Sequence, residues 1–497
     1  MPIPPEILAV ERPTNTRVLA YGKNKNLYSV IQRVGCDYKN GKRIPRYGPT
    51  IGHIVNGKFV PVNGYEPIQY ADIDIKNWGN ILLCDKLFRS MMDFLLQFYN
   101  LQDTLKLYCI TILRVCFHDI RDYQLDEKFN ASFLSEFYPN AALSKDTVSK
   151  FWQYLGRSYS IIRKFMQKRS EDVGANDLLL IDGTLKTDDL NVNTLANYSH
   201  KARKKDTKDI SILYAFDLDK MEPICSKCYP GNMLDVTSYD DFLADNKIIK
   251  GTLIGDKGFP YSSIEEYHKQ HPGLNYINPL KRNTHYIDEY NLFEYDGVIN
   301  VGSFVEYKKV KCDGIKKYLY SFREHTQASS EEISQLQKYW KNGGYNFTEM
   351  NSKKSKFGTI ILESDLDIAP RKAYLVYDFR WQIEIVMRYY KVSCGFNDTG
   401  VHDDYSVIGS EFCNFLATVL TYRLINKFEQ VGLLENYTYK EIMDTLRGAK
   451  KVRELDGEWR LLKLNPSKLD ILRKLDIIPK PKLPTKKKSG RPPKSKV

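Results

Sequence analysis

The stretch LLLIDGT, residues 178–184, decides the fold of the central part of this chain. Four apolar residues run without interruption into an aspartate and a glycine, which is typical of a buried strand that ends in a polar turn. Similar strands are predicted at 210–219, 222–231, 252–256 and 275–280. Helical patterns separate the third strand from the fourth and the fourth from the fifth. This order of strands and helices predicts an α/β fold.

The pattern changes several times on either side of these strands. Short alternating runs with NG and GK turns come first, helical spacing follows, and the chain ends in a Pro- and Lys-rich segment. Ser144 is predicted to cap a helix, and the short helices around it form either a helix-turn-helix or a plain helical bundle. We expect seven segments: a β-rich N-terminal region (1–75), a helical domain (76–170), the first part of the α/β core (171–284), a β-rich insertion (285–365), the second part of the core (366–432), a helical C-terminal region (433–479) and a disordered basic tail (480–497).

The composition narrows the class of protein. The 497 residues include 74 Lys and Arg against 61 Asp and Glu, a net charge of +13, which favours a polyanionic partner such as nucleic acid. With 42% hydrophobic residues the chain has enough apolar mass for large cores. Neither a signal peptide nor a membrane-spanning run is expected, and nine scattered cysteines fit reduced thiols. We therefore expect a soluble cytoplasmic protein without a membrane partner.

Two aspartates stand out because each follows an apolar strand. Asp182 ends LLLID and Asp256 ends TLIGD, and a glycine follows each at once or one residue later. Carboxylates at strand ends emerge where open α/β sheets usually bind ligands. The alternative for either residue alone is an aspartate that caps a turn.

The segment YDFRWQIEIVMRYYK, residues 377–391, is predicted to be helical. At 100° per residue, four of its side chains share an arc of roughly 60°; they are Tyr377, Arg380, Glu384 and Lys391. An acid between two bases suits a metal ion together with an anionic substrate. The alternative is a solvated face with an Arg380 to Glu384 ion pair.

The spacing Y-(2)-R-(3)-E-(6)-K resembles the YREK signature of a group of bacterial insertion-sequence transposases with a DDE active site. The stretches LLLIDGT, YPGNMLD and LIGDKGF resemble that group too, in the expected chain order. The resemblance implies an RNase H-like core with a mixed sheet, interrupted by the β-rich insertion. It also implies that Asp182, Asp256 and Glu384 are the catalytic acids and the metal ligands. Because three converging carboxylates repel one another, such a site needs cations, and oxygen ligands favour two Mg²⁺ or Mn²⁺ ions.

The resemblance also implies the reaction and its partners. The expected activity is cleavage of double-stranded DNA at terminal inverted repeats, followed by joining of the freed 3′-hydroxyl ends to target DNA. Tyr377, Arg380 and Lys391 are expected to position the terminal phosphates. The resemblance makes the helical domain 76–170 a candidate for binding the DNA ends. A homodimer in the DNA complex, a place at the bacterial nucleoid and the absence of a small-molecule substrate are implied as well. Two alternatives stay open: a metal-dependent nuclease without strand transfer, and a domesticated, non-catalytic DNA-binding protein.

The tail KKKSGRPPK, residues 486–494, resembles an AT-hook with Gly490, Arg491 and Pro492 as its core. Arg491 is then expected in a narrow A·T minor groove, with lysines on the flanking phosphates. Residues 480–497 carry eight basic residues and no acidic one. The alternative is a flexible basic tail that gives non-specific affinity for DNA.

Overall fold

The computed structural model falls into two compact units, residues 1–74 and 75–497. It describes residues 3–22, 26–39, 42–62, 73–188, 192–199, 207–233, 235–255, 261–314, 316–344, 346–380, 398–454 and 457–480. Among these residues, no helix combines the length and the apolar composition that crossing a bilayer requires.

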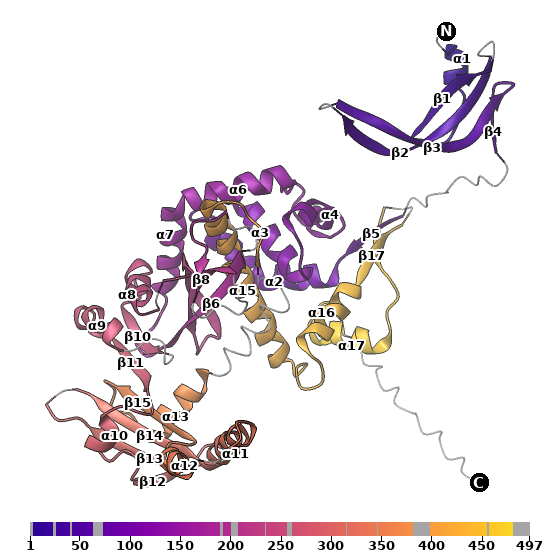
Figure 1. Ribbon diagram of the computed structural model, residues 1–497. Coiled ribbons are helices and arrows are strands. Elements are labelled where there is room, and N and C mark those ends of the chain that lie inside the picture. Colours follow the sequence, from indigo (N-terminus) through magenta and orange to yellow (C-terminus); the bar gives the residue numbers. More distant parts are fainter. Residues whose placement is uncertain are drawn as a thin grey trace, which may run out of the picture. The chain divides into compact units, whose positions relative to one another are not determined.

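The first unit is an antiparallel sheet in the order β1-β2-β3-β4, preceded by a single helical turn (Figure 1). Its small core consists of Val18, Val30, Ile51 and Ile54. β2 and β3 are much longer than their neighbours, so the sheet has four strands at one end only. The elements are α1 (Pro5–Leu8), β1 (Thr16–Tyr21), β2 (Leu27–Lys39), β3 (Lys42–Val55) and β4 (Lys58–Pro61).

The second unit is built on a mixed sheet of eleven strands. Its main path runs β12-β13-β14-β15-β11-β10-β6-β8-β7, while β9 pairs with β8 and β16 with β6. β6 is antiparallel to β8 but parallel to β10, which is parallel to β11. The strands are β6 (Leu178–Asp188), β7 (Asn197–Tyr198), β8 (Lys208–Asp217), β9 (Glu222–Pro230), β10 (Lys250–Ile254), β11 (Gly273–Leu280), β12 (Gly297–Asn300), β13 (Phe304–Lys311), β14 (Tyr318–Glu324), β15 (Thr359–Ser364) and β16 (Asp398–Thr399).

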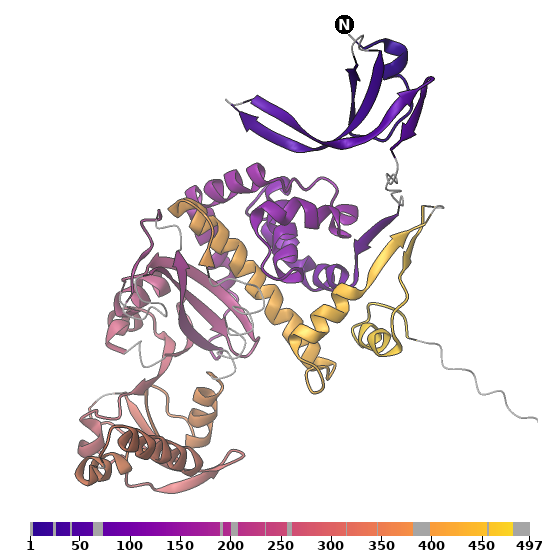
Figure 2. The same cartoon turned by 45° about the vertical axis from the view of Figure 1, so that its right-hand side comes forward.

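A group of helices covers one side of this sheet, with the 27-residue helix α15 (Asp404–Gln430) between the group and the sheet (Figure 2). α15 is buried on nearly all sides, as expected for a helix whose apolar residues are not confined to one stripe. Ser144 is the residue that precedes α6, as the sequence suggested. The covering helices are α2 (Gly79–Leu95), α3 (Leu101–Cys116), α4 (Leu125–Asn130), α5 (Leu134–Phe137), α6 (Lys145–Arg157) and α7 (Tyr159–Ser170), with a short 3₁₀ turn, η1 (Asp122–Gln124), before α4.

Glycines allow α6 and α15 to cross closely. A Cβ on Gly409 would stand 2.2 Å from the carbonyl oxygen of Trp152, and one on Gly156 would stand 1.9 Å from that of Tyr405. Both distances are far below van der Waals contact, so the two helix backbones touch at this crossing. The buried residues of α6 therefore belong to the main core.

The remaining helices lie at the edges of the sheet and at the C-terminal end. They are α8 (Asp235–Asp245), η2 (Tyr261–Ser263), α9 (Glu265–Gln270), α10 (Tyr286–Glu289), α11 (His325–Lys341), α12 (Phe347–Lys354), α13 (Pro370–Asp378), α16 (Tyr439–Gly448) and α17 (Pro466–Lys474). A second, three-stranded sheet has the order β18-β17-β5, with β5 (Asp74–Asn77), β17 (Lys450–Arg453) and β18 (Trp459–Leu461).

The α/β class predicted from the sequence is confirmed as a mixed α/β fold, and two segments differ from their description. Residues 285–365, expected to be β-rich, contain α10, α11 and α12 as well as β12 to β15, and these strands extend the main sheet. Residues 433–479, expected to be helical, also contain the β17-β18 hairpin. β5 pairs with β17 and adds a third strand to that hairpin. Because β5 is far away in the sequence, no local pattern predicts the pairing.

Candidate active site

Asp182 lies on β6, an interior strand of the main sheet that runs between β10 and β8. Leu179, Leu180 and Ile181 before it are buried, and Asp182 itself is half-buried. The N–H of Gly183 donates a hydrogen bond of 2.9 Å to its Oδ1. On β8 the residue opposite is Tyr214. The strand thus holds the carboxylate in a fixed place, with one oxygen engaged by its own backbone.

The prediction that a strand ends at Asp182 is wrong, because β6 continues to Asp188. Residues 182–188 carry polar side chains at alternate positions, and Thr184, Lys186 and Asp188 are buried. The stretch therefore lacks the apolar signal of a buried strand. On the side of β10, however, the pairing does end, since its last register pair joins Ile254 to Leu180. Asp182 lies two residues beyond the last pair on that side.

The second predicted aspartate follows β10 directly. β10 ends at Ile254, and the N–H of Gly255 donates a hydrogen bond of 3.3 Å to the carbonyl of Ile277 on β11. Asp256 is the next residue and lies outside the described residues. The described chain therefore runs from the end of β10 to Gly255, the residue before Asp256.

Polar residues of β6 face α15. Asp182, Thr184, Lys186 and Asp188 alternate along the strand and so share one face. Lys186 Nζ lies 2.7 Å from Oε2 of Glu411 on α15, and both side chains are almost fully buried, at 3% and 6% exposure. Two opposite charges removed from water at this distance compensate each other. The ion pair ties β6 to α15 four residues beyond Asp182.

Further along α15, aromatic side chains pack against the same part of the sheet. The ring of Phe415 stacks on Tyr214 at 6.5 Å between centroids, and the ring of Tyr422 lies 5.6 Å from that of Phe216. Tyr422 is fully buried. Burial, and then the negative charge of Asp182, raise the pKa of Tyr422 well above its ordinary value. Its hydroxyl therefore stays neutral near the aspartate.

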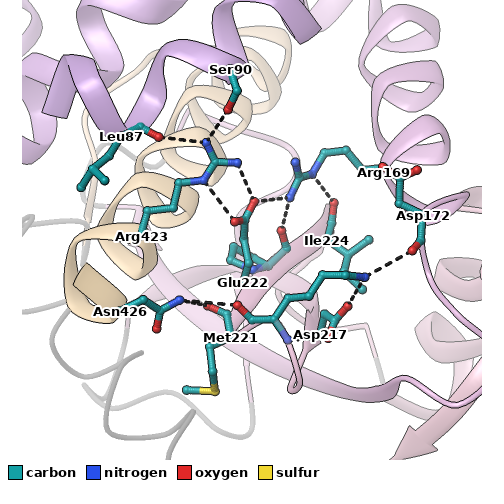
Figure 3. A network of polar contacts seen from close by, with 12 residues as sticks. Leu87, Ser90, Arg169, Asp172, Asp217, Met221, Glu222, Ile224, Arg423 and Asn426 are labelled. Atoms are coloured by element: carbon teal, nitrogen blue, oxygen red, sulfur yellow. Dashed lines mark hydrogen bonds and ion pairs between the residues drawn. The ribbon is translucent and has the colours of Figure 1, made fainter. Parts of the chain in front are cut away.

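A network of charges fixes α15 to the turn between β8 and β9 (Figure 3). Glu222, the first residue of β9, accepts bonds from two arginines: Arg169 Nη2 at 2.9 Å, and Arg423 Nε and Nη2 at 3.1 Å each. Arg423 also donates to the carbonyl of Leu87 and to Ser90 Oγ on α2. Burial, which alone raises the pKa of Glu222, is outweighed by the two guanidinium groups, so that this pKa is lowered.

The turn itself carries a second set of ionic contacts. Lys220 Nζ lies 2.7 Å from Asp217 and 3.1 Å from Asp177, and it donates to the carbonyl of Asp172. The N–H groups of Asp219 and Lys220 both donate to Asp217 Oδ1. This end of the β6-β8-β9 meander is thus held to α7 and α15 through charged side chains.

Tyr377 and Arg380, two of the residues predicted to position DNA, lie together at the end of α13. The helix begins at Pro370, a residue suited to the first helical turn, and is described to Asp378. The Arg380 guanidinium carbon lies 5.5 Å from the ring centroid of Tyr377. Glu384 and Lys391 lie outside the described residues, as do Gly490, Arg491 and Pro492 of the tail. The predicted common helical face therefore stays a prediction.

A cavity of about 420 Å³ lies between α6 and the start of α15. Its wall includes Arg114, which is buried and donates to Asn414 Oδ1 at 2.6 Å and to Asp122 Oδ1 at 3.1 Å. Asp122 also accepts a bond of 2.7 Å from Trp152 Nε1. No motif in the sequence indicates this network, because its members are far apart in the chain.

The chemistry of the predicted metal ligands suits hard cations. Asp182 offers carboxylate oxygens, which Mg²⁺ and Mn²⁺ prefer, at a half-buried position next to the end of the β10 pairing. Within the described part of the chain, no three His, Cys, Asp or Glu side chains form a group able to hold a metal ion. Two of the three predicted ligands, Asp256 and Glu384, lie outside that part.

Comparison with known proteins bears on the same region. No curated protein matches the chain. Among solved structures, it is similar to the cryo-EM structure of a piggyBac transposase synaptic complex with hairpin DNA, at 13% sequence identity and a TM-score of 0.36 over 76% of this chain and 82% of that chain. The family model described as "Transposase DDE domain" matches residues 174–404. The span that holds Asp182 and all the strands of the main sheet therefore matches a transposase DDE domain.

Proposed function

We propose that this protein is a DNA transposase of the DDE type, with the motifs of the bacterial insertion-sequence group that carries the YREK signature. In this proposal it binds the ends of its element, cleaves there and joins the 3′-hydroxyl ends to target DNA. One observation carries most of the weight: in a region that matches a transposase DDE domain, Asp182 lies on β6 and the neighbouring parallel strand ends two residues before Asp256. Parallel neighbours bring two carboxylates to one part of a sheet.

The order of the main strands supports an RNase H-like core. Apart from the two-residue β7, the first strands of the sheet in chain order are β6, β8, β9 and β10, and in space they run β9-β8-β6-β10-β11. The first predicted acid is on the first of these strands, and the second follows the fourth, as the family resemblance implies. The third, Glu384, belongs to the segment between α13 and β16.

In this proposal Asp182, Asp256 and Glu384 hold two divalent cations, Mg²⁺ or Mn²⁺. When bound, the cations would activate the attacking hydroxyl and stabilise the leaving 3′-oxygen of an in-line phosphoryl displacement. The protein's own contribution is to orient the carboxylates. The Gly183 N–H fixes one oxygen of Asp182. α15, held by Lys186 and by Glu222, packs against the same face of β6 and keeps the strand in place.

Contacts to DNA are assigned to three places. Tyr377, Arg380 and Lys391 would position the terminal phosphates, with Arg380 as a planar donor. The helical residues 76–170 would contact the element ends. The tail 480–497 would enter A·T minor grooves through Arg491. We further propose that the protein acts as a homodimer on paired ends, in the bacterial cytoplasm at the nucleoid.

A strand-transfer assay tests the proposal. The substrate is a precut duplex with the sequence that flanks the reading frame in its genome, labelled at the recessed 3′ end, with supercoiled plasmid as target and Mg²⁺ present. A transposase joins the label to the plasmid. Cleavage of uncut ends without joining would instead identify a nuclease, and binding without either reaction would identify a non-catalytic DNA-binding protein.

The tail needs its own test. Removal of residues 480–497 should abolish the preference for A·T-rich over G·C-rich duplexes of equal length, measured by competition binding, while an unspecific basic tail would lower affinity for both duplexes equally.

A further inference from the structure

The long hairpin of the first unit extends beyond the sheet from which it starts. β1 pairs with β2 only from Leu27 to Gln32, and β4 pairs with β3 only from Gly52 to Val55. From Arg33↔Tyr47 to Lys39↔Lys42, β2 and β3 pair with each other alone. We call residues 33–39 and 42–47 the β2-β3 ribbon; the two curved strands can be followed in Figures 1 and 2. At about 3.3 Å per residue the ribbon is about 20 Å long.

Neither face of the ribbon is covered by the unit's own core. None of residues 33–37 and 44–47 is buried, whereas Val30, Ile51 and Ile54 at the other end of the same strands are. Val34 and Ile44 are more than 40% exposed. A two-stranded ribbon without a packed face is only marginally stable in water by itself. A partner that contacts the ribbon would therefore contribute to its order.

The charge of the ribbon identifies the kind of partner. Arg33 and Arg46 are exposed, and the sequence adds Lys39, Lys42 and Arg43 at the last register pairs. The only acid of the ribbon is Asp37, which lies 3.8 Å from Arg46. The ribbon thus carries five basic residues and one acidic residue. Its basic residues repel one another, and its net positive charge attracts a polyanion.

Register shifts occur at the base of the ribbon. The pairing of β2 with β3 is interrupted between Val30 and Ile31, between Ile31 and Arg33, and between Arg33 and Gly35. β-bulges increase the twist and bend a strand. The Arg33 N–H also bonds to the carbonyl of Asn15 at 2.9 Å, and Asn15 Nδ2 bonds back to the carbonyl of Arg33 at 3.2 Å. The ribbon is thus turned relative to the sheet and tied at its base to the segment before β1.

We propose that the β2-β3 ribbon is a double-stranded DNA contact that enters the major groove, separate from the catalytic region and from the tail. The B-form major groove, about 12 Å wide and 8.5 Å deep, admits a two-stranded β-ribbon. Cations carried by both strands of the ribbon, among them the exposed Arg33 and Arg46, would then pair with phosphates on the groove walls. The proposal rests on the proposed function for the choice of DNA among polyanions.

Binding by the full chain tests the charge part of the proposal. The ribbon variant Lys39→Gln/Lys42→Gln/Arg43→Gln is compared with a matched control, Lys23→Gln/Lys25→Gln/Lys58→Gln. The control removes the same charge from the same unit but leaves the ribbon unchanged: in the sequence Lys23 and Lys25 fall between β1 and β2, and Lys58 is the first residue of β4. Fluorescence anisotropy of a labelled duplex is measured over a salt series in EDTA, so that no cleavage occurs.

The ribbon variant should lower the slope of log K against log salt by about 2.7, which is about 0.9 for each of the three phosphates that the variant no longer neutralises. It should also bind at least about tenfold more weakly at the lowest salt concentration, while the control changes the slope by less than about 1. Equal losses of affinity in both variants, or no loss in either, would overturn the proposal. Hydrogen exchange of β1 to β4 checks that both variants keep the sheet.

A second measurement tests the groove. Guanine N7 lies in the major groove, so the wild-type chain should protect some guanines from methylation by dimethyl sulfate, and the ribbon variant should lose that protection. A-form RNA has a major groove too narrow for a ribbon, so affinity for duplex RNA should be the same in both proteins. Equal weakening on RNA and DNA would mean charge attraction without groove entry. Because these measurements need no catalysis, they stand even if the strand-transfer assay fails.

Discussion

Replacing Glu222 by Gln tests whether the ion pairs of Glu222 with Arg169 and Arg423 stabilise the second unit. The carboxylate accepts three hydrogen bonds from Arg169 and Arg423 at 2.9 to 3.1 Å, and its side chain is 21% exposed. A hydrogen bond to a charged group contributes about 1.5–3 kcal/mol, and a buried ion pair that loses one partner costs about 3–5 kcal/mol. Because some solvent reaches Glu222, we expect a loss of about 3 kcal/mol in the free energy of unfolding at pH 7.

The effect should depend on pH in a defined direction. The pKa of Glu222 is lowered in the folded protein, so its contribution is complete above the unfolded-state pKa of about 4.3. The contribution is lost as the pH falls from there through the lower folded-state value. The difference between wild type and Glu222→Gln should therefore be constant from pH 7 to pH 5 and shrink below about pH 4.3.

Urea unfolding followed by tryptophan fluorescence measures this difference. All five tryptophans lie in residues 75–497, so the signal comes from the second unit alone. The control is Glu171→Gln, which breaks an exposed ion pair with Lys168 and should leave the unfolding midpoint unchanged. A Glu222→Gln protein as stable as wild type at pH 7, or one whose deficit persists undiminished at pH 3.5, would refute the reasoning.

Two further changes probe the packing of α15. Gly409→Ala places a methyl group 2.2 Å from the Trp152 carbonyl oxygen and should lower the free energy of unfolding by about 1–3 kcal/mol. The control is Gly448→Ala, whose methyl group would stand in open space and should leave the free energy of unfolding unchanged. The same urea titration measures both. Lys186→Met leaves the buried Glu411 carboxylate without its cation and should cost about 3–5 kcal/mol, most of which the added change Glu411→Met should restore. A loss below about 1 kcal/mol for Lys186→Met would show that the ion pair does not hold β6 to α15.

The strands of the central sheet could be predicted because each has its own apolar run. LLLID, ISILYAFD and TLI are buried in the structure largely where the sequence indicates strands. The second half of β6 could not be found in this way, since Lys186 and Asp188 point into the protein and are compensated by Glu411 and Asn193. In the hydropathy pattern of the sequence, buried polar residues that are paired with each other cannot be told from the exposed polar residues of a loop.

The candidate site could be predicted only in its parts. The position of Asp182 on a strand, and the end of β10 just before Asp256, follow from local sequence. The charged residues that hold α15 and the β8-β9 turn in place could not be predicted from local sequence, because Glu222, Arg423 and Arg169 come from three elements far apart in the chain. Pairings of that kind depend on how the whole unit packs. The β5-β17 pairing was missed for the same reason.

Metal-dependent cleavage of an end-containing duplex by single carboxylate variants tests the central claim most directly. Asp182→Asn, Asp256→Asn and Glu384→Gln should each abolish cleavage in Mg²⁺ or Mn²⁺ and keep wild-type affinity for the same duplex in EDTA, because each variant removes one charged oxygen ligand and preserves the side-chain shape. Cleavage at the wild-type rate by any one of the three would contradict the assignment of these residues to the active site.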